Sequence, residues 1–172
     1  MIKPQIFSII VLIFSVHTAP CQSSITASEK TLTYLKKFRT DFSNAQLNEK
    51  PEAIQPYFAD DIRLMPEFQK TIMSKSNASL YWKSFAARFD TQEYRRTETE
   101  ILDLGSRILE TGSFSMKMKL KSDGKIFELK GKYFDLWKKD NEQILLLTQA
   151  WNYDHAVNFT DQLKFTEVPP LL

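Results

Sequence analysis

The sequence predicts an α+β domain in which helices cover one face of a curved antiparallel sheet. Three stretches carry this prediction: residues 78–89 place apolar side chains at helical spacing, residues 108–120 alternate apolar and polar side chains, and residues 131–154 form two aromatic-rich runs around a polar turn. The first pattern is typical of an amphipathic helix, the second of a strand and the third of a β-hairpin. Because most helical segments precede the long strands, helices and strands should form separate layers.

Composition is consistent with a single domain, residues 26–155. The chain has 172 residues, 42% hydrophobic and 26% charged, enough to bury about two thirds of its unfolded surface. The 23 basic and 21 acidic residues nearly balance. No global positive field attracts nucleic acid, and we expect no nucleic-acid partner.

The N-terminus, residues 1–21, is predicted to be a signal peptide. Lys3 precedes an apolar run of eleven residues, 6–16, which is shorter than the ~20 residues that a membrane-spanning helix needs. Residues 18–21 match a bacterial lipobox only in part, so two alternatives stay open: a lipid anchor on Cys21, or ordinary cleavage after it. We expect an exported protein, periplasmic or secreted, that meets a membrane only if Cys21 is lipidated.

The mature chain begins with a predicted helix. Thr26 and Glu29 have the spacing of a capping box, in which each side chain satisfies a free amide of the first turn. One face of this helix then carries apolar residues at helical spacing: Leu35, Phe38, Phe42 and Ala45. That face should pack into the core.

Two shorter elements follow. Pro51 fits the first turn of a helix that continues to about Tyr57, because proline lacks an amide that would be unpaired there. Residues 58–65 then alternate as a strand does, and Pro66 ends them.

The third helix has the broadest apolar stripe, formed by Ala78, Tyr81, Trp82, Phe85, Ala86 and Phe89. From residue 93 onward the period changes to two. Residues 93–104 are mostly polar, as in an edge or outer strand, whereas residues 108–120 alternate regularly. A turn around Gly124 leads into the last hairpin, and the tail, residues 156–172, has no clear period.

Three of these segments together resemble a known family. They are residues 58–67, the helix that carries Tyr81 and Trp82, and the closing hairpin, residues 131–154. They are similar to the SnoaL-like branch of the nuclear transport factor 2-like superfamily, whose enzyme relatives include ketosteroid isomerase and polyketide cyclases. The resemblance implies a cone-shaped sheet enclosing three helices and a pocket, commonly in a homodimer formed through the sheet. A fold of this kind does not by itself determine function.

The resemblance also implies where the catalytic groups of the isomerase would fall. The base position falls on Pro66, the tyrosine position near Phe38 and the position of the protonated aspartic acid on Tyr133, so no role is carried over intact. Glu67, one residue beyond the base position, could reach inward only if a bulge re-aimed it. The alternative for Glu67 is a solvated carboxylate at the rim.

The closing hairpin suggests a pocket wall of its own. Alternation places Tyr133, Asp135 and Trp137 on one face, opposite Phe134 and Leu136. On the paired strand it places these residues inward: Leu145, Leu147, Gln149 and Trp151. A buried Asp135 must find a partner or shift its pKa upward. The candidate ligand-binding residues are Phe38, Phe42, Trp82, Tyr133, Asp135, Trp137, Gln149 and Trp151.

Three functions remain open at this point. The first is binding of a small, largely apolar ligand, the second an isomerase- or cyclase-type enzyme with Asp135 or Glu67 as base and Tyr133 as acid, and the third a structural homodimer whose cone is filled. Histidine occurs only at positions 17 and 155 and the single cysteine is Cys21. Because neither a zinc-binding set nor a glycine-rich phosphate loop is present, we expect no metal and no cofactor.

Overall fold

The computed structural model describes residues 25–67, 69–140 and 143–154. The signal peptide, Cys21 and the tail, which the sequence predicts at residues 1–21 and 156–172, lie outside these ranges. The elements are, in order, β1 (Ile25–Thr26), α1 (Glu29–Leu47), the 3₁₀-helix η1 (Pro51–Tyr57), β2 (Phe58–Met65), β3 (Ile72–Met73), α2 (Lys75–Arg88), β4 (Phe89–Asp103), β5 (Arg107–Leu120), β6 (Ile126–Asp140) and β7 (Gln143–Tyr153). No helix in these ranges is both long and apolar enough to cross a membrane.

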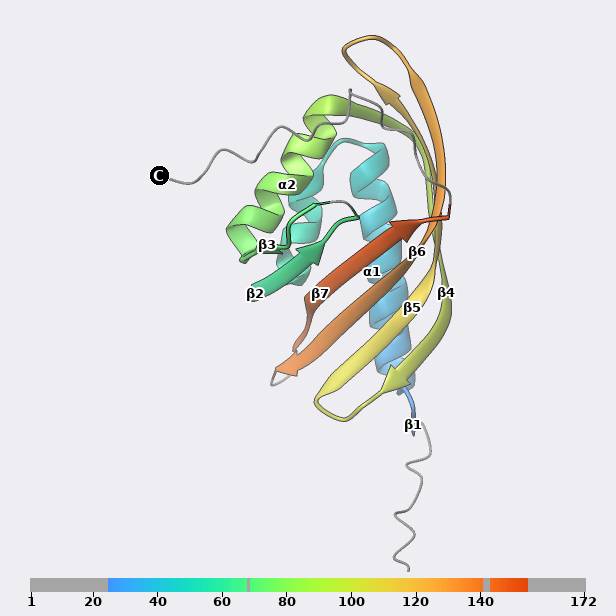
Figure 1. Cartoon of the computed structure of the whole chain (residues 1–172). Helices are drawn as coiled ribbons and strands as arrows, with labels where there is room; N and C mark the ends of the chain where they lie inside the picture. Colours follow the sequence, from blue (N-terminus) through green and yellow to red (C-terminus); the bar gives the residue numbers. More distant parts are fainter. Residues whose placement is uncertain (1–24, 68, 141–142, 155–172) are drawn as a thin grey trace, which may run out of the picture.

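The strands form one curved sheet in the order β1-β4-β5-β6-β7-β2-β3, with α1 and α2 on its concave side (Figure 1). The predicted α+β cone with three helices is therefore confirmed. One detail of the prediction is wrong, because the sheet is not wholly antiparallel: β2 runs parallel to β7. The two strands are joined by a long crossover through α2 and the four intervening strands, β3 to β6, and such crossovers are what parallel pairing requires.

Helix α1 begins later than the capping-box spacing suggests. Its N-cap is Ser28, whose Oγ accepts the backbone N–H of Thr31 at 3.2 Å. Thr26 belongs instead to β1, where it pairs with Leu102 of β4. The predicted apolar face is buried against the sheet in full: Leu35, Phe38, Phe42 and Ala45.

Helix α2 ends one residue earlier than its apolar stripe. Phe89 opens β4 and pairs with Leu120 of β5, while its backbone N–H still donates to the carbonyl of Phe85. The ring of Phe89 remains buried and lies 5.0 Å from that of Phe85, centroid to centroid. The stripe therefore continues across the junction from helix to strand, which explains why spacing alone did not reveal the boundary.

An irregularity in the last hairpin changes the inward set on β7. Asp135 pairs with Gln149 as alternation predicts, but Trp137 pairs with Leu146, so the register shifts by one residue between the two pairs. Leu146 is fully buried inside the cone and Leu145 only half-buried. The prediction that Leu145 faces inward is therefore wrong, because an extra residue in β7 reverses the parity of the strand beyond it.

Candidate functional site

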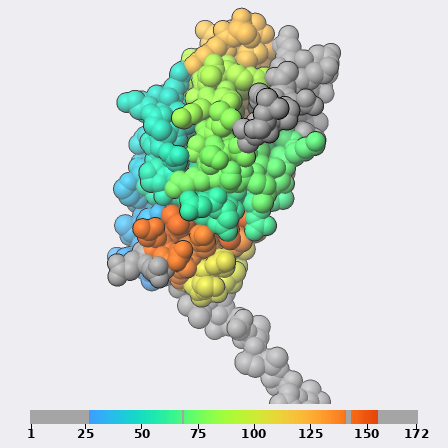
Figure 2. Space-filling view, turned by 90° about the vertical axis from the view of Figure 1, so that its left-hand side faces the viewer, coloured from blue at the N-terminus to red at the C-terminus, as the bar shows by residue number. Residues whose placement is uncertain are grey.

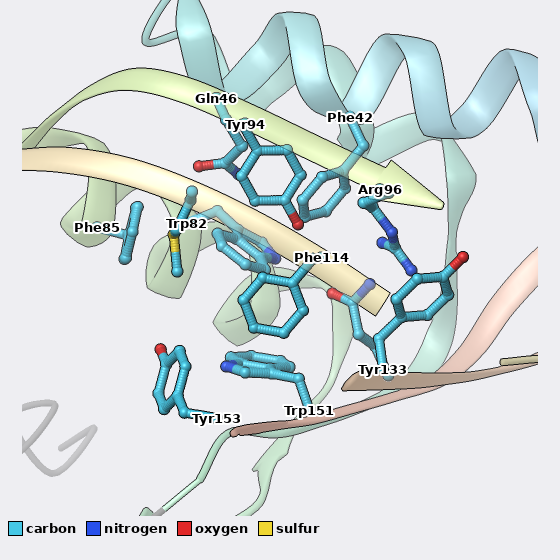
Figure 3. A pocket seen from close by; sticks show the side chains of 12 residues that line it. Phe42, Gln46, Trp82, Phe85, Tyr94, Arg96, Phe114, Tyr133, Trp151 and Tyr153 are labelled. Carbon is cyan, nitrogen blue, oxygen red and sulfur yellow. The ribbon is translucent and has the colours of Figure 1, made fainter. Parts of the chain in front are cut away.

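A narrow cavity lies between the helices and the concave face of the sheet (Figure 3). Its volume is about 30 Å³, room for two or three water molecules. Its wall consists of Phe42, Gln46, Trp82, Phe85, Tyr94, Arg96, Phe114, Met116, Tyr133, Gln149, Trp151 and Tyr153. Figure 2 shows the face of the molecule on which α2 and η1 lie over the sheet.

Two glycines allow aromatic rings to lie flat on the sheet. A Cβ on Gly112 would come within 2.6 Å of the ring of Tyr133, and a Cβ on Gly131 within 2.7 Å of the ring of Phe114. Each glycine faces its aromatic residue across the β5–β6 ladder. Any residue other than glycine would place a Cβ in the space that the facing ring occupies. The two glycines therefore allow both rings to lie at the cavity wall.

Arg96 of β4 supplies the positive charge at the cavity (Figure 3). Its side chain is 2% exposed, and its Nη2 donates to Oδ2 of Asp135 at 2.5 Å. The guanidinium carbon lies 3.7 Å from the ring centroid of Tyr133 and 5.1 Å from that of Phe42. This stacking and ion pairing hold the guanidinium in one orientation.

Asp135 lies behind the wall and is fully buried. Besides the bond from Arg96, it accepts a hydrogen bond from Nε2 of Gln149 at 3.2 Å. Burial, aided by the nearby carboxylate of Glu110, raises the pKa of Asp135 to about 6 against the opposing effect of the Arg96 charge. The partner that a buried Asp135 requires is therefore Arg96, with Gln149 as the second.

A second buried pair continues the network. Glu110 is fully buried, and its Oε1 accepts hydrogen bonds from Tyr133 Oη at 2.9 Å and from Arg39 Nη1 at 2.8 Å. Arg39 also contacts the exposed carboxylate of Glu98 at 3.2 Å. The hydroxyl of Tyr133 is thus directed toward Glu110, and burial raises the pKa of Tyr133. Only the ring of Tyr133 is presented to the cavity.

Three polar atoms of wall residues are buried without a hydrogen-bond partner in the described part of the chain: Arg96 Nε, Gln149 Oε1 and Trp82 Nε1. Buried polar atoms in folded proteins are almost always paired, with protein or with water. The two N–H groups can donate and the amide oxygen can accept. The residues of the wall therefore carry unpartnered hydrogen-bonding groups of both kinds.

The structure brings five of the eight candidate binding residues to the cavity: Phe42, Trp82, Tyr133, Gln149 and Trp151. Asp135 lies one layer deeper. Phe38 and Trp137 are fully buried in the core beneath α1, their ring centroids 4.6 Å apart. All eight occupy the concave side, but three of them do not line the cavity.

The candidate acid and base residues all have oxygens bonded within the protein. Glu67 lies just after β2 and does not line the cavity; its Oε2 accepts the backbone N–H of Tyr153, a wall residue, at 2.6 Å. Asp135 bonds Arg96 and Gln149, and the hydroxyl of Tyr133 bonds Glu110. In the ranges that the structure describes, no three His, Cys, Asp or Glu side chains are grouped so as to hold a metal ion.

Sequence reasoning did not name seven of the wall residues as ligand-binding: Gln46, Phe85, Tyr94, Arg96, Phe114, Met116 and Tyr153. Phe114 and Met116 belong to the alternating apolar set of β5 and could have been included on that ground. Arg96 could have been sought because a buried Asp135 requires a cation. Nothing in the polar run of β4 distinguishes Arg96 from its neighbour Arg95, which is exposed.

Comparison with known proteins gives structural matches only. No protein-family model matches the chain, and no curated protein matches its sequence. A ketosteroid isomerase-like protein from Erwinia carotovora atroseptica is similar with a TM-score of 0.66 and 11% identity, over 74% of this chain and 99% of that one. A nuclear transport factor 2-like protein from Cytophaga hutchinsonii is similar with a TM-score of 0.60 and 10% identity, over 74% and 99%.

A third similar structure is a hexachlorocyclohexane dehydrochlorinase, LinA type 2, with a TM-score of 0.63 and 9% identity, over 73% of this chain and 86% of that one. These identities are too low to transfer an activity. The agreement covers 99% of each of the first two solved chains. The chain therefore has the nuclear transport factor 2-like fold.

Proposed function

We propose that the chain binds a small, largely apolar molecule in the cavity between α2 and the sheet. The observation that carries this proposal is the group of three unpartnered polar atoms on an otherwise aromatic wall: Arg96 Nε, Gln149 Oε1 and Trp82 Nε1. An apolar cavity with a few convergent polar groups is the usual composition of a small-molecule site. A protein of the same fold is named for its action on hexachlorocyclohexane, itself a small apolar molecule.

The size of the cavity makes binding depend on side-chain movement. A volume of about 30 Å³ is well below the roughly 150 Å³ of a cavity that admits benzene. Met116 lies on the wall, and its unbranched thioether side chain can change rotamer at little cost. We infer that a ring enters when Met116 and its aromatic neighbours move, so that affinity is reduced by the cost of that rearrangement.

The small volume also favours a second candidate, a non-catalytic structural homodimer whose cone is filled by its own side chains. An isomerase- or cyclase-type activity has less support, because both oxygens of Asp135, the hydroxyl of Tyr133 and one oxygen of Glu67 are engaged in internal hydrogen bonds. A general base must reach the proton that it removes.

A titration of the protein with toluene would test the binding proposal. The readout is the NMR signals of the three tryptophan indole N–H groups. Trp82 and Trp151 line the cavity and stack at 5.7 Å, whereas Trp137 is buried in the core away from it. We expect saturable shifts of the Trp82 and Trp151 signals, and a much smaller shift of the Trp137 signal. Absence of any saturable shift up to the solubility of toluene would favour the filled cone.

A pair of methionine variants sharpens this test. Met116→Ala removes a side chain from the wall and should tighten toluene binding, because less rearrangement is then needed. Met118→Ala removes the same side chain from a buried position on the same face of β5 that does not line the cavity. This control should leave toluene affinity nearly unchanged; equal effects of the two variants would place the toluene elsewhere.

A further inference from the structure

The charges buried around the cavity balance one another. Four charged side chains are buried in the described part of the chain, the cations Arg39 and Arg96 and the anions Glu110 and Asp135. Each cation contacts one of these anions directly, Arg39 at 2.8 Å and Arg96 at 2.5 Å. A charged ligand group would therefore bring an uncompensated charge into a low-dielectric site.

The polar atoms left free at the wall are complementary to one another. Asp135 accepts a hydrogen bond from the amide N–H of Gln149, so the Gln149 amide group is fixed with its oxygen directed away from Asp135. That oxygen, Oε1, and the Nε of Arg96 are both buried and lack partners in the described residues. Both side chains bond the same carboxylate, which keeps an acceptor and a donor on the same part of the wall.

Resting on the proposed function, we infer that the cavity takes an uncharged molecule whose polar end both accepts and donates a hydrogen bond, as a primary carboxamide does. The ligand carbonyl accepts from Arg96 Nε–H and the ligand N–H donates to Gln149 Oε1. Trp82 Nε1–H is a further donor on the wall. The remaining surface of the ligand is apolar, since the rest of the wall consists mainly of aromatic rings and Met116.

A carboxylate is a poor match for the same atoms. It has no hydrogen to donate to Gln149 Oε1 and would face that oxygen with a negative charge. It would also approach the Asp135 carboxylate, whose charge is already paired with Arg96. Benzamide and benzoate have nearly the same shape, so the cavity should distinguish them by charge and by hydrogen-bond pattern, with higher affinity for benzamide.

Binding of toluene, benzamide and benzoate to the full chain at pH 7.5 tests the inference, with the same indole signals as the readout. Benzamide should bind about tenfold or more tightly than benzoate, because it forms both hydrogen bonds and brings no charge. Benzamide should also bind more tightly than toluene. Equal affinities for benzamide and toluene, or tighter binding of benzoate, would overturn the inference while leaving the binding proposal intact.

A charge-switch variant gives a second measurement. Asp135→Asn leaves the Arg96 charge unbalanced and should raise the ratio of benzoate to benzamide affinity by about tenfold or more. Asp123→Asn is the matched control, because it makes the same change in net charge at an exposed turn residue. An unchanged ratio in a folded Asp135→Asn protein would contradict the charge-balance argument; if that variant does not fold, the wild-type comparison decides alone.

The two proposals fail in different ways. If none of the three compounds shifts the Trp82 and Trp151 signals in the wild type or in Met116→Ala, both the proposed function and the inference that rests on it are refuted. If toluene binds and benzamide does not, only the inference is refuted.

Discussion

The ring of Tyr133 covers Gly112 on the neighbouring strand, so closely that a Cβ there would lie 2.6 Å from the ring. The same Cβ would lie 2.3 Å from the backbone oxygen of Thr97, which cannot move independently of its strand. The Tyr133 ring can take this position only because residue 112 has no side chain. The stacking of Arg96 on that ring depends on glycine at position 112 for the same reason.

Gly112→Ala should accordingly destabilise the protein by about 1–3 kcal/mol, the usual cost of overpacking a closely packed site. Chemical denaturation measures this change. Ser113→Ala, at the adjacent and exposed position of β5, is the control and should change the free energy of unfolding by less than about 0.5 kcal/mol. A stable Gly112→Ala protein would show that β4 and β5 can separate locally without cost.

Phe85→Ala should cost roughly 3–5 kcal/mol, because Phe85 is buried where α2 meets the sheet and contacts Trp82 and Phe89. Leu80 is on the same helix and 41% exposed, so Leu80→Ala should have little effect on the same denaturation measurement. A loss below about 1 kcal/mol for Phe85→Ala would mean that α2 does not depend on this face.

Asp135 should titrate near pH 6. Burial raises the pKa of Asp135 to about 6, whereas the unfolded chain has about 3.9. The folded protein then binds this proton more tightly, so the contribution of Asp135 to stability is fully present below pH 4 and is lost as the pH rises through 6.

Carbon-13 NMR of the Asp135 carboxyl group measures the midpoint directly. The free energy of unfolding of the wild type should also fall relative to that of Asp135→Asn as the pH rises from 4 to 7, because only the wild type loses this proton. A midpoint below 4 would instead show that the attraction of Arg96 outweighs burial.

We propose that the chain forms a homodimer through the convex face of the sheet. Phe134 is 42% exposed there, and the paired residues Leu109 and Leu136 on the same face are half-buried. Exposed apolar surface of this kind often marks an interface. Sedimentation velocity at micromolar concentration should show two chains per particle.

Phe134→Glu should convert that particle to a monomer, because a carboxylate would have to lose its water at the interface. Leu80→Glu, which places the same charge on an exposed apolar residue of α2, should remain dimeric. A wild-type protein that is still monomeric at millimolar concentration would rule the dimer out.

The order of the three helices and of the five longer strands could be predicted from the sequence, because most of these segments show a helical or an alternating pattern. The two-residue strands β1 and β3 were not predicted, since two residues are too few to show a period. In the last hairpin, alternation placed Tyr133 and Asp135 inside and Phe134 outside, as the structure has them. The same rule failed at Leu145 because residues 145–147 are all leucine, so no polar residue marks the extra residue of β7.

The sequence predicted which face of a strand a side chain lies on better than it predicted whether that side chain reaches the cavity or lies in the core. Trp137 and Tyr133 are both inward residues of β6, yet only Tyr133 reaches the cavity, because the rings of Tyr34 and Phe38 pack against Trp137. Arg96 was missed for a related reason. A strand of mostly charged residues has no apolar pattern to indicate which of its side chains lie inside.

The parallel pairing of β2 with β7 also bears on the order in which the molecule folds. Leu64 of β2 lies beside Gln149 of β7, so β2, which pairs on its other edge with the two-residue strand β3, joins the main sheet only when the last strand is in place. Pairings between residues this far apart in the sequence slow folding, because a long loop must close first. The cavity is consequently completed late, and a bound ligand should lengthen the lifetime of the folded chain more than it hastens folding.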